Sequence, residues 1–238
     1  MHFDATVNYG IYNLPYDIMV SAESKFMQKY LINKNSNNLL IFFAGWGCDE
    51  FEFEHLKSES DILILYNYSD LNLDFDFKKY KNLDLIAFSA GVFVASIMNF
   101  DFKINKKIAM SGNPYLFDTH FGLSKEIQNI LYNITEVNAD DFARNYLVKT
   151  ESEWKIFHHS KRTLDSCKDE FDSLKKLYAE NKHNIKDIYE IALIGGDDKI
   201  FNVLALKEFY GKKLNIIENA RHNLFFRIDS YEQVLANL

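Results

Sequence analysis

Residues 83–98 read LDLIAFSAGVFVASIM, an apolar stretch that changes character at Ser89. Residues 83–88 have the length and apolar content of a buried strand, and residues 92–98 those of an apolar helix. Ala87, Ala90 and Gly91 are small enough for a sharp turn, where a bulky side chain would collide with neighbouring backbone. The stretch therefore predicts a strand, a tight turn at Ser89 and a helix, which is the setting of a nucleophilic serine.

Further segments of the chain have strand length and are followed by turn or helix signals. They are residues 39–43, 61–66, 107–110, 188–194 and 214–217. Strands separated by helical patterns form right-handed βαβ units, and the sheet that they build is covered by helices on both faces. The sequence therefore predicts an α/β fold with a mostly parallel central sheet.

The strand pattern stops between residues 113 and 187, where spacings such as Phe142 to Tyr146 are helical. We predict that residues 113–187 are a helical cap inserted into a core made of residues 27–112 and 188–238. Such a cap would fold over the carboxyl ends of the strands, where open α/β sheets bind ligands. Residues 1–26 show neither a helical period nor the turn chemistry of a strand pair, so we interpret them as an N-terminal extension.

Composition and charge argue against several classes of protein. The net charge of -7 disfavours a general nucleic-acid binder, which needs a positive face. The longest apolar stretch is shorter than the roughly 20 residues of a membrane span, and the first residues lack a secretory signal. Cys48 and Cys167 suit free thiols in a reducing cytosol, so we expect a cytoplasmic protein. Zinc-site spacings are missing, so we expect neither a metal nor an organic cofactor.

Ser89 is the candidate nucleophile because it would lie at the amino end of a helix, where backbone N–H groups and the helix dipole favour developing negative charge. The Ala90 N–H would be one oxyanion donor. The loop after residues 39–43 would supply the second, which we assign to the Trp46 N–H. The alternatives are that Ser89 only caps the helix and that Trp46 only packs in the core.

An acid and a histidine follow two later strands. Asp198 is the preferred acid because two apolar residues follow it closely, and Asp197 is the alternative, with a turn or capping role otherwise. His222 lies in a polar loop after residues 214–217, a strand-end position that the other histidines do not share. The order Ser89, Asp198, His222 is that of the α/β-hydrolases. In such a triad His222 takes the proton of Ser89 while Asp198 orients the imidazole.

The sequence also resembles the BioG-type pimeloyl-[acyl-carrier protein] methyl ester esterases of biotin synthesis. The resemblance depends on FAGWG at 43–47, YSDLNLDFDF at 68–77, FSAGV at 88–92, DKIF at 198–201, and His222. It runs from Met27, which corresponds to the start of the family, to the C-terminus, and is weak through the cap. It implies a serine carboxylesterase that removes the methyl group from a seven-carbon diacid half-ester on acyl carrier protein and leaves the thioester intact.

Residues 142–168 contain six basic and three acidic side chains. This local positive charge would be either a solvated helical surface or a docking site for an acidic partner. The resemblance implies that partner, because acyl carrier proteins are acidic. The docking residues that we then expect are Arg144, Lys149, Lys155, Lys161 and Arg162.

Two other functions stay open at this point. The triad alone also fits a general carboxylesterase or thioesterase acting on small free acyl substrates. If Ser89 is only a helix cap, the chain would instead be an inactive binding protein with a hydrolase fold.

Overall fold

The computed structural model describes residues 26–236, so the predicted N-terminal extension lies outside them apart from Phe26 and stays a prediction. The described chain forms a seven-stranded sheet in the order β1-β3-β2-β4-β5-β6-β7. β1 is antiparallel to β3, and the other neighbouring pairs are parallel. The strands are β1 (Gln28–Ile32), β2 (Asn38–Phe43), β3 (Asp61–Tyr66), β4 (Asn82–Phe88), β5 (Lys107–Met110), β6 (Ile191–Gly195) and β7 (Leu214–Ile217).

The six predicted strands are all present, and the predicted parallel sheet is confirmed. The strand predicted over residues 188–194 begins later, at Ile191, which is the first residue of that segment to pair with β5. Tyr189, just before it, is buried, and its hydroxyl donates to the Val92 carbonyl at 2.6 Å. The analysis missed β1. Its sequence QKYLI is only partly buried at the sheet edge, so it lacks the apolar run that marks the central strands.

Helices cover both faces of the sheet because side chains alternate along each strand. Leu39, Ile41 and Phe43 of β2 pack on the face covered by α1 (Ala90–Ile97) and α6 (Val203–Tyr210). Leu40 and Phe42 pack on the other face, against α7 (Tyr231–Leu235) and the short 3-10 helices η1 (Glu50–Phe53) and η5 (Leu224–Arg227).

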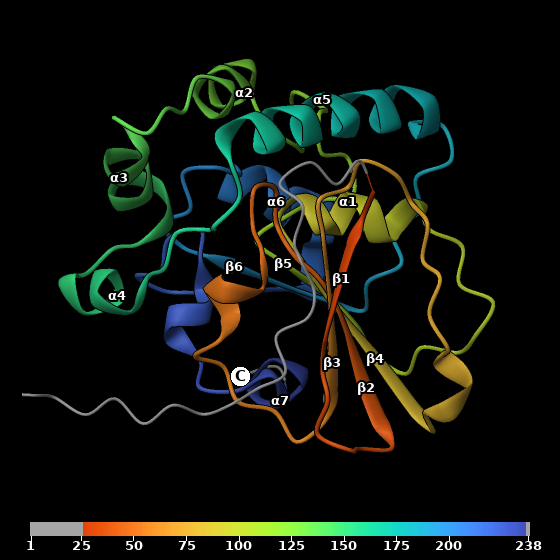
Figure 1. Ribbon diagram of the computed structural model, residues 1–238. Coiled ribbons are helices and arrows are strands. Elements are labelled where there is room, and N and C mark those ends of the chain that lie inside the picture. Colours follow the sequence, from red (N-terminus) through yellow and green to blue (C-terminus); the bar gives the residue numbers. More distant parts are fainter. Residues whose placement is uncertain (1–25, 237–238) are drawn as a thin grey trace, which may run out of the picture.

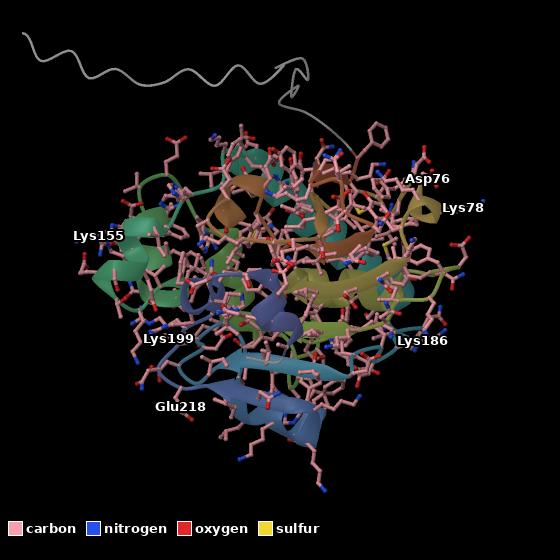
Figure 2. All side chains as sticks on the ribbon, turned by 90° about the horizontal axis from the view of Figure 1, so that it is seen from below. Asp76, Lys78, Lys155, Lys186, Lys199 and Glu218 are labelled. Carbon is pink, nitrogen blue, oxygen red and sulfur yellow. The ribbon has the colours of Figure 1, made fainter. Side chains whose placement is uncertain are left out.

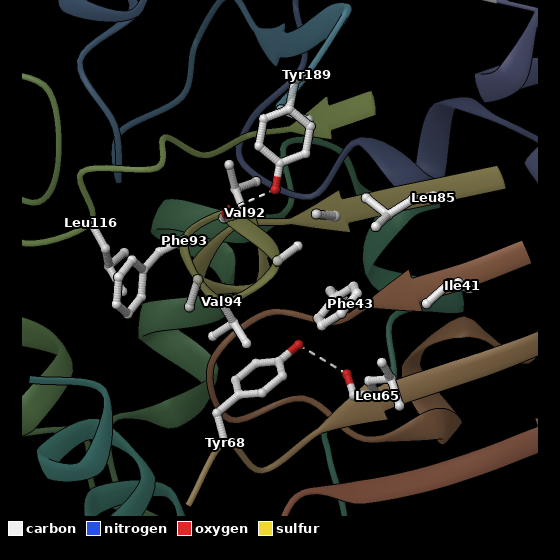
Figure 3. Packing of buried hydrophobic residues seen from close by; sticks show 14 of the residues in the cluster. Ile41, Phe43, Leu65, Tyr68, Leu85, Val92, Phe93, Val94, Leu116 and Tyr189 are labelled. Atoms are coloured by element: carbon white, nitrogen blue, oxygen red, sulfur yellow. Dashed lines mark hydrogen bonds between the residues drawn. The ribbon is translucent and has the colours of Figure 1, made fainter. Parts of the chain in front are cut away.

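The helix α1 is fixed at the centre of the molecule. Figure 3 shows its side chains Val92, Phe93 and Val94 packed between strand residues and two buried tyrosines. The Tyr189 hydroxyl donates to the Val92 carbonyl, and the Tyr68 hydroxyl donates to the Leu65 carbonyl at 2.9 Å. Hydrogen bonds satisfy both buried hydroxyls, so the tyrosines add packing area without leaving polar groups unpaired.

The chain between β5 and β6 is helical, and we call residues 113–187 the helical segment. It contains α2 (Lys125–Tyr132), α3 (Ala139–Phe142), the π-helix η3 (Ala143–Leu147), α4 (Glu151–Ile156) and α5 (Leu164–Asn181). Figure 1 shows α5 on the outer side of α1, with α2 next to it and α3 and α4 farther away at the left of the view. Phe171 and Leu174 of α5 belong to the same buried cluster as Phe93 of α1, so this segment packs on the α1 face of the sheet.

Candidate active site

Ser89 forms a strained turn between β4 and α1. Its backbone has φ 53° and ψ -120°, a region that non-glycine residues rarely adopt and that costs about 1–3 kcal/mol. Two glycines permit the turn: a Cβ at Gly91 would lie 2.5 Å from the Phe43 carbonyl oxygen, and one at Gly112 would lie 2.5 Å from the Ser89 carbonyl oxygen. Ser89 lies at the N-cap position of α1, but its hydroxyl makes no capping hydrogen bond. A capping role therefore does not explain this serine.

The Ser89 hydroxyl, His222 and Asp198 form a hydrogen-bonded row. His222 Nε2 lies 3.0 Å from Ser89 Oγ, and His222 Nδ1 lies 2.9 Å from Asp198 Oδ2. A carboxylate only accepts hydrogen bonds, so Nδ1 carries the imidazole proton and Nε2 is left to accept from the serine hydroxyl. This is the tautomer that a general base for Ser89 requires.

The two candidate aspartates have different surroundings. The Asp198 side chain is fully buried, and its Oδ1 accepts from the backbone N–H groups of Ile200 at 2.7 Å and Phe201 at 3.0 Å. The Asp197 side chain is 46% exposed and pairs with Lys149, whose hydrogen bond lowers the pKa of that carboxyl. Asp198 alone of the two contacts His222, so the geometry favours the acid that the sequence analysis preferred.

The three side chains come from loops that follow β4, β6 and β7, at one edge of the sheet. Gly195 lets the acid loop and the histidine loop touch, because a Cβ there would lie 2.3 Å from the Arg221 carbonyl oxygen. His222 lies between two rings: Phe201 stacks on it at 6.0 Å between centroids, and Phe88 lies 5.2 Å away. This packing limits rotation of the imidazole.

The predicted oxyanion residues Trp46 and Ala90 line the same cavity as Ser89 and His222. Within residues 26–236 neither of their backbone N–H groups donates to a protein acceptor. The Trp46 indole points away from them, since its Nε1 donates to the Cys167 carbonyl at 2.6 Å. The role of both N–H groups as oxyanion donors stays a prediction.

The cavity has a volume of about 180 Å³ and is mostly apolar. Its apolar wall is built largely by the helical segment, through Leu123, Leu131, Ile134, Phe142, Leu147 and Phe171. Cys48 and Glu52 form a polar part of the lining, which we call the polar wall. The Cys48 thiol donates to Glu52 Oε2 at 3.4 Å. A chain of methylene groups fits the apolar part better than a charged ligand does.

Burial shifts the titration of the groups at the polar wall. Burial, followed by the negative charge of Asp49, raises the pKa of Glu52 to about 8. Burial also raises the pKa of Cys48 well above its ordinary value and that of Cys167 to about 11. Both thiols are free and buried, and as thiols rather than thiolates they are weak nucleophiles.

The five predicted docking residues do not share one environment. Lys155 and Lys161 are exposed, and Figure 2 shows Lys155 at the edge of the molecule. Arg144 pairs with Glu151 at 2.8 Å, and Lys149 pairs with Asp197. Arg162 differs from the other four, because its side chain is only 8% exposed, forms an ion pair with the buried Glu170 and lines the cavity. A docking role for it stays a prediction.

Two features of the site escaped the sequence analysis. One is Glu170, whose position three residues after Cys167 and four before Leu174 puts it on the buried face of α5, a signal that was available. The other is the contact between η3 and the histidine loop, in which the His222 N–H donates to the Tyr146 carbonyl at 3.3 Å. No residue pattern marks a contact between backbone groups.

A family model described as pimeloyl-ACP methyl esterase BioG matches residues 27–234. An uncharacterized protein from Haemophilus influenzae is 27% identical over 205 residues, covering 84% of this chain and 95% of that protein. The malonyl-[acyl-carrier protein] O-methyltransferase of Bacteroides fragilis is 28% identical over 186 residues, which are 75% of this chain and 38% of that protein.

Solved structures give the fold. The crystal structure of BioG from Haemophilus influenzae has a TM-score of 0.75 at 25% identity, with 86% of this chain and 98% of that chain covered. A lipase-esterase related protein from Clostridium acetobutylicum has a TM-score of 0.59 at 21% identity, with 84% and 94% covered. The predicted α/β-hydrolase fold is confirmed.

Proposed function

Since the chain belongs to the BioG family of pimeloyl-ACP methyl esterases, we propose that it hydrolyses pimeloyl-[acyl-carrier protein] methyl ester to pimeloyl-[acyl-carrier protein] and methanol. The observation that supports this most directly is the row of Asp198, His222 and Ser89, which opens onto an apolar cavity. The row supplies the chemistry of ester cleavage, and the cavity suits the methylene chain between the two ends of a seven-carbon diacid.

The reaction proceeds in two halves. Ser89 Oγ attacks the carbonyl carbon of the methyl ester while His222 Nε2 takes its proton, and the N–H groups of Trp46 and Ala90 stabilise the oxyanion. The bond to the methoxy group then breaks, and His222 returns the proton so that methanol leaves. In the second half His222 takes a proton from water, whose oxygen attacks the carbonyl carbon of the acyl-enzyme. The bond to Ser89 Oγ then breaks, His222 returns the proton to Ser89 Oγ, and the product acid loses its own proton to solvent to give the free carboxylate. Asp198 stabilises the imidazolium in both halves.

The identity of the methyl ester has separate support. The relative from Bacteroides fragilis is a malonyl-[acyl-carrier protein] O-methyltransferase, and this chain is similar to only 38% of it. A methyl group added to a carrier-bound acid must later be removed by an esterase if the free acid is to be recovered. The part of the methyltransferase relative that is similar to this chain is a candidate for that esterase. The proposed substrate is accordingly a methyl ester on acyl carrier protein rather than a free ester.

The docking surface is also a proposal. Lys155 and Lys161 are the members of the predicted set that are exposed and form no ion pair with a carboxylate of the described residues; Lys155 lies at the end of α4, and Lys161 lies in the loop that joins α4 to α5. This loop borders the cavity through Phe157, His159 and Ser160. An acidic carrier that docks there would bring its arm to the cavity, and the distal ester would reach Ser89 while the thioester stays outside.

The test is hydrolysis of the carrier-bound methyl ester and of free dimethyl pimelate by the wild type and by Ser89→Ala. We expect kcat/KM to be at least tenfold higher for the carrier-bound ester, and Ser89→Ala to lose about 10⁴-fold or more of kcat. Ser96→Ala is a matched control, because the buried Ser96 lies in α1 and donates only to the Phe93 carbonyl. Equal rates on both esters would indicate a general carboxylesterase. A fluorophosphonate probe that fails to label wild-type Ser89 would indicate a binding protein.

A further inference from the structure

Glu170 is a carboxylate in the interior of the protein. It lies in α5, its side chain is fully buried, and it forms an ion pair with Arg162, whose side chain is 8% exposed. Removing both charges from water carries a large free-energy cost, and only good geometry with further hydrogen bonds offsets that cost. A buried ion pair does not by itself show that it stabilises the fold. The other hydrogen-bond partners of Glu170 indicate a second role.

The Glu170 carboxylate holds two loops of the core. Oε2 accepts from the Gly47 N–H at 3.0 Å and from Arg162 Nη1 at 2.5 Å, while Oε1 accepts from the Tyr68 N–H at 3.0 Å. Gly47 follows β2 and Tyr68 follows β3, so one side chain of the helical segment joins the ends of two neighbouring strands. Each oxygen accepts from backbone, which fixes the chain itself rather than a side chain.

Other contacts attach the same loop to the same region. The Trp46 indole donates to the Cys167 carbonyl at 2.6 Å, and Arg162 Nη1 donates to the Cys48 carbonyl at 3.4 Å. At the other end of the loop, the Tyr68 hydroxyl shares its single hydrogen between the Ala44 carbonyl at 2.7 Å and the Leu65 carbonyl at 2.9 Å. The loop is therefore attached at Ala44, at Trp46, and at Gly47 and Cys48. Glu170 forms the attachment at Gly47 directly, and it contributes to the one at Ala44 by binding the Tyr68 N–H.

This loop needs to be held because its own sequence allows several conformations. Residues 44–47 read AGWG, and Gly47 has φ +74°, which glycine adopts without strain. An oxyanion donor must already point at the position of the developing charge, since reorientation during the reaction would consume the stabilisation. A fixed acceptor for the Gly47 N–H restrains the adjoining Trp46–Gly47 peptide.

We propose that Glu170, paired with Arg162, is a positioning residue that holds the Trp46 N–H in the direction required to bind the oxyanion. The inference rests on the proposed esterase function, and it deepens it: the helical segment completes the catalytic site as well as enclosing the substrate. Glu170 acts through the loop and touches no reacting atom. Its loss is therefore expected to lower kcat more than it changes KM.

The first variant is Glu170→Gln, which keeps the shape of the side chain but replaces one acceptor oxygen with an NH₂ donor. That donor would face either Gly47 and Arg162 or Tyr68, all of which donate hydrogen bonds. With p-nitrophenyl butyrate as substrate, we expect kcat to fall about 10- to 100-fold, with KM changed less than about twofold. The labelling rate of Ser89 by a fluorophosphonate should fall in parallel, because its adduct also carries an oxygen in the oxyanion site. Glu180→Gln, exposed on the same helix, should change neither.

A second variant separates positioning from stability. Glu170→Gln leaves the Arg162 charge buried without a carboxylate and lowers the melting temperature, whereas the double variant Arg162→Met/Glu170→Gln removes both charges and should regain stability. We expect the double variant to keep the low kcat of Glu170→Gln. Recovery of kcat together with the melting temperature would overturn the inference, because the pair would then have only a structural role.

The outcomes also separate this inference from the proposed function. An active wild type whose Glu170→Gln variant keeps its kcat would overturn the inference alone. A wild type without any esterase activity would overturn the proposed function and the inference with it.

Discussion

The sheet core and the helical segment contribute differently to the candidate site. Loops of the core supply Ser89, Asp198 and His222, and within residues 26–236 the helical segment adds no member to that hydrogen-bonded row. The helical segment builds most of the apolar cavity wall and contacts the loops that carry Trp46 and His222. Under the proposed function, the core would supply the chemical step, while the helical segment would align the loop of Trp46 and select the substrate.

The helical segment holds the two core loops by different chemistry. The histidine loop is held through backbone carbonyls: His222 donates to the Tyr146 carbonyl at 3.3 Å, and Arg221 Nη1 donates to the Val148 carbonyl at 2.8 Å. The loop of Trp46 is held by the Glu170 carboxylate as well as by the Cys167 carbonyl. Substitution of Glu170 removes the carboxylate but leaves the attachments through backbone carbonyls in place.

The largest effect is expected in the core, at the acid. Asp198→Asn replaces the carboxylate with an amide that can present a donor to His222, which then adopts the wrong tautomer for taking the Ser89 proton. We expect kcat on p-nitrophenyl butyrate to fall about 10⁴-fold. Asp197→Asn is the matched control, since that side chain is half-exposed and pairs with Lys149. Equal losses in both variants would contradict the assignment of Asp198.

A substitution in the helical segment should affect stability instead of the chemical step. Leu174 of α5 is fully buried in the main core cluster, so Leu174→Ala should lower the free energy of unfolding by about 2–5 kcal/mol. Leu204→Ala in α6 is the control, because Leu204 is 75% exposed and should cost less than about 0.5 kcal/mol. Urea unfolding measures both. A Leu174→Ala variant as stable as the Leu204→Ala variant would show that α5 is not packed on the core as described.

The core and the helical segment also differ in how well their structure could be predicted from the sequence. In the core, local rules agree: runs such as residues 39–43 are apolar throughout, and Ser89 is surrounded by the small residues that its turn requires. Five of the six predicted strands therefore begin within one residue of the prediction. The order Ser89, Asp198, His222 predicted the hydrogen-bonded row because strand ends of a parallel sheet share an edge.

In the helical segment, the local sequence pattern did not predict where individual side chains lie. Arg162 was expected among the docking residues because it belongs to a locally basic stretch, but the tertiary fold pairs it with the buried Glu170. The edge strand β1 escaped for a related reason, since one partner strand is enough to fix it and its half-exposed residues carry no clear period. Where contacts with distant parts of the chain determine the structure, the local sequence pattern does not predict it.

The proposed docking surface should give a smaller effect than either of these changes. Lys155→Glu/Lys161→Glu should lower kcat/KM for the carrier-bound methyl ester about 5- to 10-fold at low salt and leave that for p-nitrophenyl butyrate unchanged. The difference should shrink as salt is added, because exposed charges are screened. Lys186→Glu is the control: Lys186 is exposed, and Figure 2 shows it on the opposite side of the molecule from Lys155. An equal loss in Lys186→Glu would indicate a net-charge effect and no specific surface.

The smallest effect concerns the polar wall where core and helical segment meet. Glu52 of the core has a pKa raised from 4.5 to about 8, first by burial and then by the charge of Asp49. Between these two values the unfolded chain has lost this proton while the folded protein keeps it, so folding binds a proton and stability falls as the pH rises. Glu52→Gln cannot lose a proton. We therefore expect the melting temperature of the wild type to fall more steeply from pH 5 to pH 8 than that of Glu52→Gln.

The difference between the two slopes should amount to a few degrees per pH unit. One proton bound on folding changes the free energy of unfolding by about 1.4 kcal/mol per pH unit, and about 1 kcal/mol changes the melting temperature of a chain of this size by about 2–4 °C. Glu54→Gln supplies the control, since Glu54 lies on the exposed side of the same short segment and its loss should leave the slope unchanged. Thermal unfolding at pH 5, 6, 7 and 8 gives the slopes directly. Parallel slopes for the wild type and Glu52→Gln would mean that Glu52 is already ionised in the folded protein. The cavity would then carry a fixed negative charge beside the acyl chain, and its apolar wall alone would have to select the substrate.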